Sequence, residues 1–99
     1  MDILELTPAQ ARERMARGVL LIDVREPHEW AAGMAEGARG IASGDLRAGL
    51  ETHLPDATQE VLLICQSGRR SHDAAVALHG EGYERVASVA GGTLAWRDA

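Results

Sequence analysis

The fold of this chain is decided by the stretch VLLICQSGRRSH, residues Val61 to His72. Its first four residues are apolar without alternation, which predicts a strand buried on both faces, as in a parallel sheet. From Ser71 to His79 apolar residues recur on one face, which predicts a helix. A buried strand that passes through a short glycine-containing loop into a helix is the repeating unit of an α/β protein.

The same alternation of strand and helix is predicted on both sides of this stretch. Further strands are expected at Ile3–Leu6, Val19–Ile22, Ile41–Ser43 and Val86–Val89. Further helices are expected from Thr7 to about Ala16, from Glu26 to Trp30, from an N-cap at Asp45 to His53, and from Thr93 to Arg97. Residues 33–40 are expected to be irregular. The chain is therefore predicted to be a single α/β domain, residues 1–99, with a mostly parallel five-stranded sheet and helices on both faces, in three layers.

Composition excludes several classes of protein. The chain has 99 residues, a formal net charge of −5 and ten basic residues that are all arginine. A negative total disfavours nonspecific binding to nucleic acid, which needs a basic face. The longest apolar runs, such as Val61–Cys65, fall far short of the roughly 20 residues that span a bilayer. We therefore expect no nucleic-acid partner and no membrane partner.

Cys65 is the only cysteine, so it has no partner for an internal disulfide and no companion for a cysteine-rich zinc site. The histidines at 28, 53 and 79 lack the spacing of metal ligands, and no metal site is expected. A lone thiol suits a reducing compartment, and the first ten residues show no secretory signal pattern. A cytoplasmic location is the resulting prediction.

The loop after Cys65 has the features of an anion site. The carboxyl ends of parallel strands share one edge of a sheet, so Cys65 and Asp23 are expected on the same rim. A helix N-terminus presents unpaired backbone N–H groups, and Gly68 permits a tight bend toward the sulfur. Arg69 and Arg70 add permanent positive charge. Such surroundings lower a cysteine pKa from about 8.5 to roughly 3.5–7.5 and yield a nucleophilic thiolate.

Plainer interpretations stay open at this point. Cys65 can be a small buried apolar residue, and the two arginines can be solvated charges. His72 is expected to face solvent on the first turn of a helix, and an ionised thiolate needs no general base. Asp23 and Arg25 are predicted to support the loop through hydrogen bonds or an ion pair.

Two further pairs of residues are assigned structural roles. Glu26 and Glu29 are interpreted as acids that favour the beginning of a helix. Trp30 and Trp96 are interpreted as packing residues, because the chain has one tyrosine and no phenylalanine to supply aromatic core.

Several motifs together resemble the rhodanese superfamily, in particular its single-domain sulfurtransferases. They are LIDVREPHEW at Leu21–Trp30, Gly33, Gly37-Ala38, the strand and loop Val61–Ser71, and a closing pattern of Gly82-Tyr83, Val86, Gly91-Gly92 and Trp96. These matches occur in the order typical of the family and span about Leu20 to Trp96. The resemblance implies a rhodanese-like topology for the predicted α/β fold.

The resemblance also implies a reaction of the thiosulfate:cyanide sulfurtransferase type. The Cys65 thiolate would take the outer sulfur of a small anionic donor, hold it as a persulfide and pass it to cyanide or to a thiol. The sulfur charge would be stabilised by the backbone N–H groups of Gln66, Ser67, Gly68, Arg69, Arg70 and Ser71, as in an oxyanion hole. No metal or organic cofactor is implied, and a protein bearing a thiol or persulfide is a possible partner.

Two alternatives remain beside this hypothesis. Gln66 stands where many rhodaneses have arginine, which tilts the interpretation toward a sulfur carrier or interaction module that relays a persulfide from a partner protein. Phosphatases of the same fold, and related arsenate reductases, bind tetrahedral oxyanions. The phosphatases place arginine six positions after the cysteine, where this chain has Ser71, and Arg70 stands at five. The smaller loop favours a sulfur atom over a phosphate.

Overall fold

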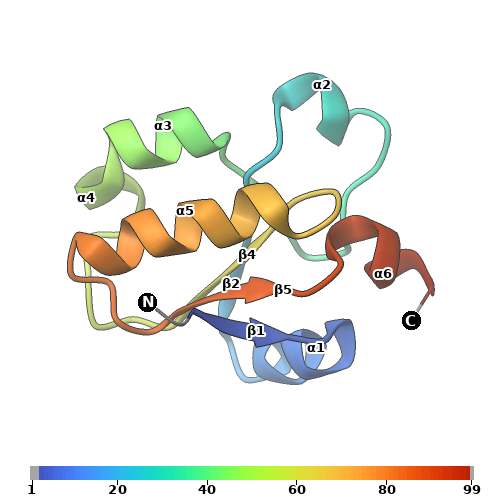
Figure 1. Ribbon diagram of the computed structural model, residues 1–99, viewed down its shortest axis with the longest axis horizontal. Coiled ribbons are helices and arrows are strands. Elements are labelled where there is room, and N and C mark those ends of the chain that lie inside the picture. Colours follow the sequence, from blue (N-terminus) through green and yellow to red (C-terminus); the bar gives the residue numbers. More distant parts are fainter. Residues whose placement is uncertain (1–2, 99) are drawn as a thin grey trace.

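The computed structural model describes residues 3–98 and contains one five-stranded sheet in the order β1-β5-β4-β2-β3 (Figure 1). The strands are β1 Leu4–Leu6, β2 Leu20–Asp23, β3 Arg39–Gly40, β4 Val61–Ile64 and β5 Val86–Val89. Each of the four strand pairings is parallel. The prediction of an α/β fold with a five-stranded sheet is confirmed, and the sheet is parallel throughout rather than mostly parallel.

Helices cover both faces of this sheet (Figure 1). They are α1 Pro8–Ala16, α2 Pro27–Trp30, α3 Ser43–Ala48, α4 Leu50–His53, α5 Arg69–Gly80 and α6 Gly92–Asp98. Helix α1 begins as the sequence predicts, because Thr7 and Gln10 form a reciprocal capping box and Pro8 occupies the first turn. No helix within residues 3–98 combines the length and the apolar character needed to cross a membrane.

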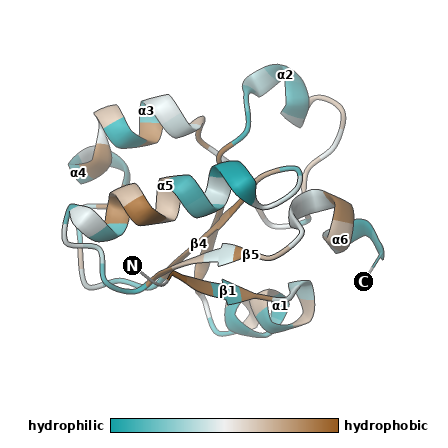
Figure 2. Ribbon diagram, viewed as in Figure 1, coloured by the Kyte–Doolittle hydropathy of each residue, from teal (hydrophilic) through white to brown (hydrophobic). Residues whose placement is uncertain are grey.

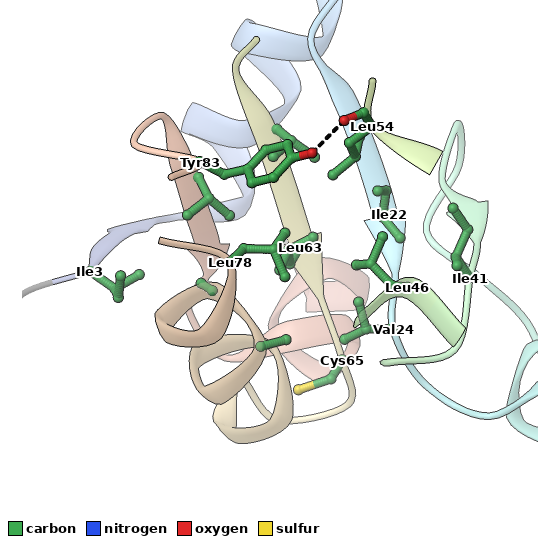
Figure 3. Packing of buried hydrophobic residues seen from close by; sticks show 14 residues of the cluster. Ile3, Ile22, Val24, Ile41, Leu46, Leu54, Leu63, Cys65, Leu78 and Tyr83 are labelled. Carbon is green, nitrogen blue, oxygen red and sulfur yellow. Dashed lines mark hydrogen bonds between the residues drawn. The ribbon is translucent and has the colours of Figure 1, made fainter. Parts of the chain in front are cut away.

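The apolar strands divide their side chains between two hydrophobic cores. On β4, Val61 and Leu63 belong to the core that contains Leu46 of α3 and Leu78 of α5, drawn in Figure 3. Leu62 and Ile64, which alternate with them, belong to the core that contains α1 and α6 residues. This alternation explains the uninterrupted apolar run, since both faces of the strand are buried. The brown colour of β4 in Figure 2 shows that this strand is hydrophobic.

Two predicted elements differ from the structure. The strand expected at Ile41–Ser43 is instead Arg39–Gly40, because helix α3 begins at Ser43 and the chain must leave the sheet before it. The single helix expected from Asp45 to His53 is two short helices that meet at Gly49. Asp45 lies in the first turn of α3 rather than at the N-cap, which is Ala42.

Helix α5 begins two residues earlier than predicted, at Arg69 rather than Ser71. Its N-cap is Gly68, which has a left-handed φ of 101° that a residue with a side chain rarely adopts. The earlier beginning shortens the loop between Cys65 and the helix. As a result, the N-terminus of α5 lies directly beside the carboxyl end of β4.

Candidate active site

Cys65 lies at the carboxyl end of β4, at one end of the apolar core (Figure 3). Its Sγ atom accepts hydrogen bonds from the backbone N–H groups of Gly68, at 3.2 Å, and Ser71, at 3.3 Å. The Ser71 hydroxyl lies 3.4 Å from the same sulfur. A helix N-terminus and two N–H groups that converge on one atom are typical of loops that stabilise a negative charge.

A buried pair of hydroxyl groups lies next to the sulfur of Cys65. The Oγ atoms of Ser71 and Ser88 are 2.7 Å apart, and both residues are fully buried. When Cys65 is ionised, the Ser71 hydroxyl can donate to Sγ while it accepts from Ser88. Sequence reasoning did not identify Ser88, because a serine within an apolar strand 17 residues beyond Ser71 carries no signal of contact.

The surroundings of the sulfur favour the thiolate. Burial by itself raises the pKa of Cys65, but the Ser71 hydroxyl and the backbone N–H groups of Ser71, Gly68 and Ser67 outweigh burial and lower the pKa below its ordinary value. The thiolate is the nucleophilic form of cysteine. The hydrogen bonds of the loop therefore favour the reactive form of Cys65.

Replacement of Ser71 by alanine is expected to raise the pKa of the Cys65 thiol, because the hydrogen bond with the Ser71 hydroxyl lowers that pKa. The rate of alkylation by iodoacetamide would shift toward higher pH. On the acidic side of the profile the rate should fall about tenfold, since a hydrogen bond to a charged group contributes roughly 1.5–3 kcal/mol. Ser67→Ala is the matched control, because it keeps the backbone N–H; an unshifted profile in Ser71→Ala would contradict the prediction.

A buried ion pair lies at the end of the neighbouring strand β2. Arg25 donates from Nε to both carboxylate oxygens of Asp23 at 3.0 Å and from Nη2 to Oδ2 at 2.8 Å. Nη2 also donates to the Gly33 carbonyl at 2.7 Å, which ties the segment after α2 to this strand. Burial opposes the charge of Arg25, but the Asp23 hydrogen bonds dominate and raise its pKa.

Arg70 is held by an ion pair with Glu29 of helix α2. Nη1 lies 2.7 Å from Oε1, and Nη2 lies 2.9 Å from Oε2, so the guanidinium binds both carboxylate oxygens. Glu29 also accepts the Glu26 backbone N–H at 3.0 Å, which agrees with its predicted place at the beginning of a helix. No sequence pattern links Glu29 to Arg70, because the two residues are 41 positions apart.

The remaining predicted loop residues have separate environments. The side chains of Gln66, Ser67 and Arg69 are exposed. The Gln66 carbonyl accepts the Leu94 N–H, and the Cys65 carbonyl accepts the Thr93 N–H, so the first turn of α6 is bonded to the active-site loop. Gly92 allows this approach, because a Cβ there would lie 2.2 Å from the Cys65 carbonyl oxygen.

Other groups considered from the sequence lie away from the sulfur chemistry. His72 is half-buried in α5, and no hydrogen bond within residues 3–98 joins its side chain to Cys65. Trp96 is buried in the second core, and the Trp30 ring covers Gly40. In the same described part of the chain, no cluster of three or more His, Cys, Asp or Glu side chains is placed to hold a metal ion.

Comparison with known proteins identifies the family of this chain. A family model described as the rhodanese-like domain matches residues 7–99. The chain belongs to the rhodanese-like domain family.

Two curated relatives and two solved structures illustrate the similarity. The thiosulfate sulfurtransferase GlpE of Ectopseudomonas mendocina is 33% identical over 96 residues, which cover 97% of this chain and 86% of GlpE. YtwF of Bacillus subtilis is 38% identical over 98 residues, covering 97% of this chain and 92% of YtwF. The human single-domain sulfurtransferase TSTD1 has a TM-score of 0.84 and 25% identity, covering 98% of this chain and 97% of TSTD1. Reduced Bacillus anthracis CoADR-RHD has a TM-score of 0.85 and 32% identity over 95% of this chain, which spans 16% of that longer protein.

Proposed function

We propose that the protein is a sulfurtransferase that carries a sulfane sulfur on Cys65. The observation that supports this most directly is the buried Sγ at the N-terminus of α5, which accepts the N–H groups of Gly68 and Ser71 and lies 3.4 Å from the Ser71 hydroxyl. Membership of the rhodanese-like family and similarity to GlpE and TSTD1 support the same activity. We propose thiosulfate as a donor and cyanide or a thiol as the acceptor.

The proposed reaction has two steps. The Cys65 thiolate attacks the outer sulfur of thiosulfate, the sulfur–sulfur bond of the donor breaks, and its electron pair leaves with sulfite. Cys65 then carries a persulfide anion. Cyanide attacks the terminal sulfur, the bond to Cys65 Sγ breaks, and thiocyanate leaves while the thiolate is regenerated. Charge is conserved in each step, and neither an oxidant nor a proton donor is needed.

The loop is proposed to stabilise the negative charge as it moves to the terminal sulfur. The N–H groups of Gly68 and Ser71 already point at Cys65 Sγ, so their dipoles require little rearrangement during the reaction. The arginine five positions after Cys65 is Arg70, and the following position is Ser71, whose buried side chain binds Sγ and Ser88. A loop closed by a small hydroxyl in this way supports a sulfur atom rather than a tetrahedral phosphate as the transferred group.

The proposal is tested by intact mass measurement after incubation with thiosulfate, removal of excess donor and omission of reductant. We expect a gain of one sulfur atom that cyanide reverses. Cys65→Ser is the control and should gain nothing, because it lacks the thiolate nucleophile. An unchanged mass in the native chain, with the thiol still free, would refute thiosulfate sulfurtransfer and direct attention to persulfide-donating proteins and oxyanion substrates.

A sulfur carrier that takes its persulfide from a partner protein is a second candidate function. The observation that favours it is Leu94, which is 48% exposed although its backbone N–H binds the Gln66 carbonyl beside the site. An exposed leucine whose backbone is bonded to the active-site loop is an apolar contact that a partner protein can use and an inorganic anion cannot. Faster persulfide transfer from a partner than from thiosulfate would distinguish the carrier from the small-molecule enzyme.

A further inference from the structure

Two arginines near Cys65, Arg25 and Arg70, are each paired with a carboxylate. The Arg25 guanidinium is bound to Asp23, and the Arg70 guanidinium is bound to both carboxylate oxygens of Glu29. Within these two pairs the two positive and two negative charges cancel. Arg70, one of the two loop arginines predicted to bind an anionic donor, is therefore already neutralised by a carboxylate of the protein. The exposed Arg69 forms no ion pair with a carboxylate among residues 3–98.

The ion pair between Arg70 and Glu29 stands on the turn of α5 that binds Cys65, since Arg70 directly precedes Ser71, whose backbone N–H donates to Sγ. The Glu29 hydrogen bond is the main cause of the raised Arg70 pKa, and the negative charges of Glu29 and Cys65 add to it. Hydrogen bonds from Arg70 and from the Glu26 backbone lower the pKa of Glu29 to about 2. Both members of the pair are thus charged throughout the physiological pH range. A donor at the site therefore meets the neutral combination of the two charges rather than the positive charge of Arg70 alone.

We propose that Glu29 is a specificity-determining residue that makes the site select sulfur donors by charge. By holding and neutralising Arg70, it favours singly charged donors over doubly charged thiosulfate. This inference rests on the proposed sulfurtransferase function and names the class of donor that the site prefers: a monoanionic persulfide or thiosulfonate. The uncharged Gln66, exposed next to Cys65, adds no cation that would reverse the preference.

The physical reason is repulsion between the donor and the nucleophile. Cys65 reacts as an anion, so every additional negative charge on the donor raises the energy of the encounter. An unpaired guanidinium near the thiolate would offset that charge, whereas a paired guanidinium offsets little. The ion pair is partly exposed, with 44% of the Arg70 side chain and 20% of the Glu29 side chain accessible, so the effect should depend on salt.

Two donors with the same reactive sulfur test the proposal. Methanethiosulfonate has a methyl group in place of one charged oxygen of thiosulfate and therefore carries a single negative charge. The Cys65 thiolate attacks its outer sulfur and releases methanesulfinate, just as thiosulfate releases sulfite. The measured quantity is the ratio of kcat/KM for thiosulfate to kcat/KM for methanethiosulfonate, with cyanide as the common acceptor.

Glu29→Gln is expected to raise this ratio about tenfold, since it frees the positive charge of Arg70, the residue directly before the Ser71 N–H that binds Sγ. The glutamine keeps an oxygen that can accept the Glu26 N–H, so the beginning of α2 is preserved. Arg70→Gln should lower the ratio, because Glu29 is then unopposed. The double variant should return close to the native ratio, since the net charge of the pair is again zero.

Glu84→Gln is the matched control. It removes the same charge from an exposed residue that precedes β5, and so lies at the amino end of the parallel strands, whereas Cys65 follows the carboxyl end of β4; the ratio should be unchanged. At ~1 M salt, where the Debye length is about 3 Å, the difference between Glu29→Gln and the native chain should shrink markedly. A change caused only by loosening of α2 would not distinguish the two donors by charge.

The outcomes separate this inference from the proposed function. A native chain that forms no persulfide with either donor refutes the function, and the inference with it. A native chain that turns over both donors, with an unchanged ratio in Glu29→Gln and in Arg70→Gln, leaves the function intact and overturns the role of Glu29. Opposite shifts of the ratio in the two single variants, cancelled in the double variant, support it.

Discussion

Gly92→Ala is expected to destabilise the protein and to disable the active-site loop together. A Cβ at this position would lie 2.2 Å from the Cys65 carbonyl oxygen and 2.5 Å from the Gln66 carbonyl carbon, and backbone atoms cannot rotate away. Gly92 also has a φ of 58°, where a side chain adds strain. Together, overpacking and strain should cost about 3–5 kcal/mol of the free energy of unfolding. Urea denaturation measures this loss.

The same substitution should slow persulfide formation about 100-fold, because displacement of a reacting group by about 1 Å can cost that much. The Thr93 N–H bond to the Cys65 carbonyl, at 2.8 Å, would be pushed apart by the new methyl group. Persulfide yield by mass, measured at a temperature where the variant is folded, separates loop displacement from unfolding. A folded variant with the native rate would show that the position of α6 does not matter to Cys65.

Two other glycines provide matched controls for Gly92. A Cβ at Gly44 would meet no atom within 4 Å, and Gly44 has no positive φ. Gly44→Ala should therefore be neutral or slightly stabilising. Gly18 has open space but a φ of 95°, so Gly18→Ala should show only the backbone cost of about 1 kcal/mol. The excess loss in Gly92→Ala over Gly18→Ala then measures the contact with the Cys65–Gln66 peptide.

The strands that the sequence predicts well are those whose apolar residues indicate that they are buried. Val61–Ile64 and Val86–Val89 are found within the bounds expected, because each is buried on both faces. Strand β3 has no such pattern, since Arg39 and Gly40 join the sheet through backbone pairing with Ile22 and Asp23. A strand of two residues held only by backbone hydrogen bonds leaves no hydrophobic period to detect.

Some positions in the candidate site can likewise be predicted from the sequence and others cannot. The places of Cys65 and Gly68 are predictable because they depend on the local passage from strand to helix. The partners of the loop are not, because Glu29 and Ser88 meet it only after α2 and β5 have packed in three dimensions. A single sequence contains the residue types of such pairs but not the distances between them.

Separation of the buried pair Asp23–Arg25 is the second change with a large expected effect. Asp23 is fully buried and only 5% of the Arg25 side chain is exposed, so Arg25→Met leaves a buried carboxylate without its main partner. Loss of one member of such a pair typically costs 3–5 kcal/mol, a large part of the roughly 5–15 kcal/mol that stabilises a domain. Urea denaturation should show this loss for Arg25→Met and for Asp23→Leu.

The double variant Asp23→Leu/Arg25→Met decides what the pair contributes. Because it removes both charges together, it should lose much less than the sum of the two single changes and regain most of the native stability. Additive losses would instead mean that each residue acts through other contacts, such as the Arg25 hydrogen bond to the Gly33 carbonyl. If the double variant is stable yet forms persulfide slowly, the pair is retained for the placement of α2 and the loop rather than for stability. A stable double variant with the native rate would refute the supporting role that we propose for Asp23 and Arg25.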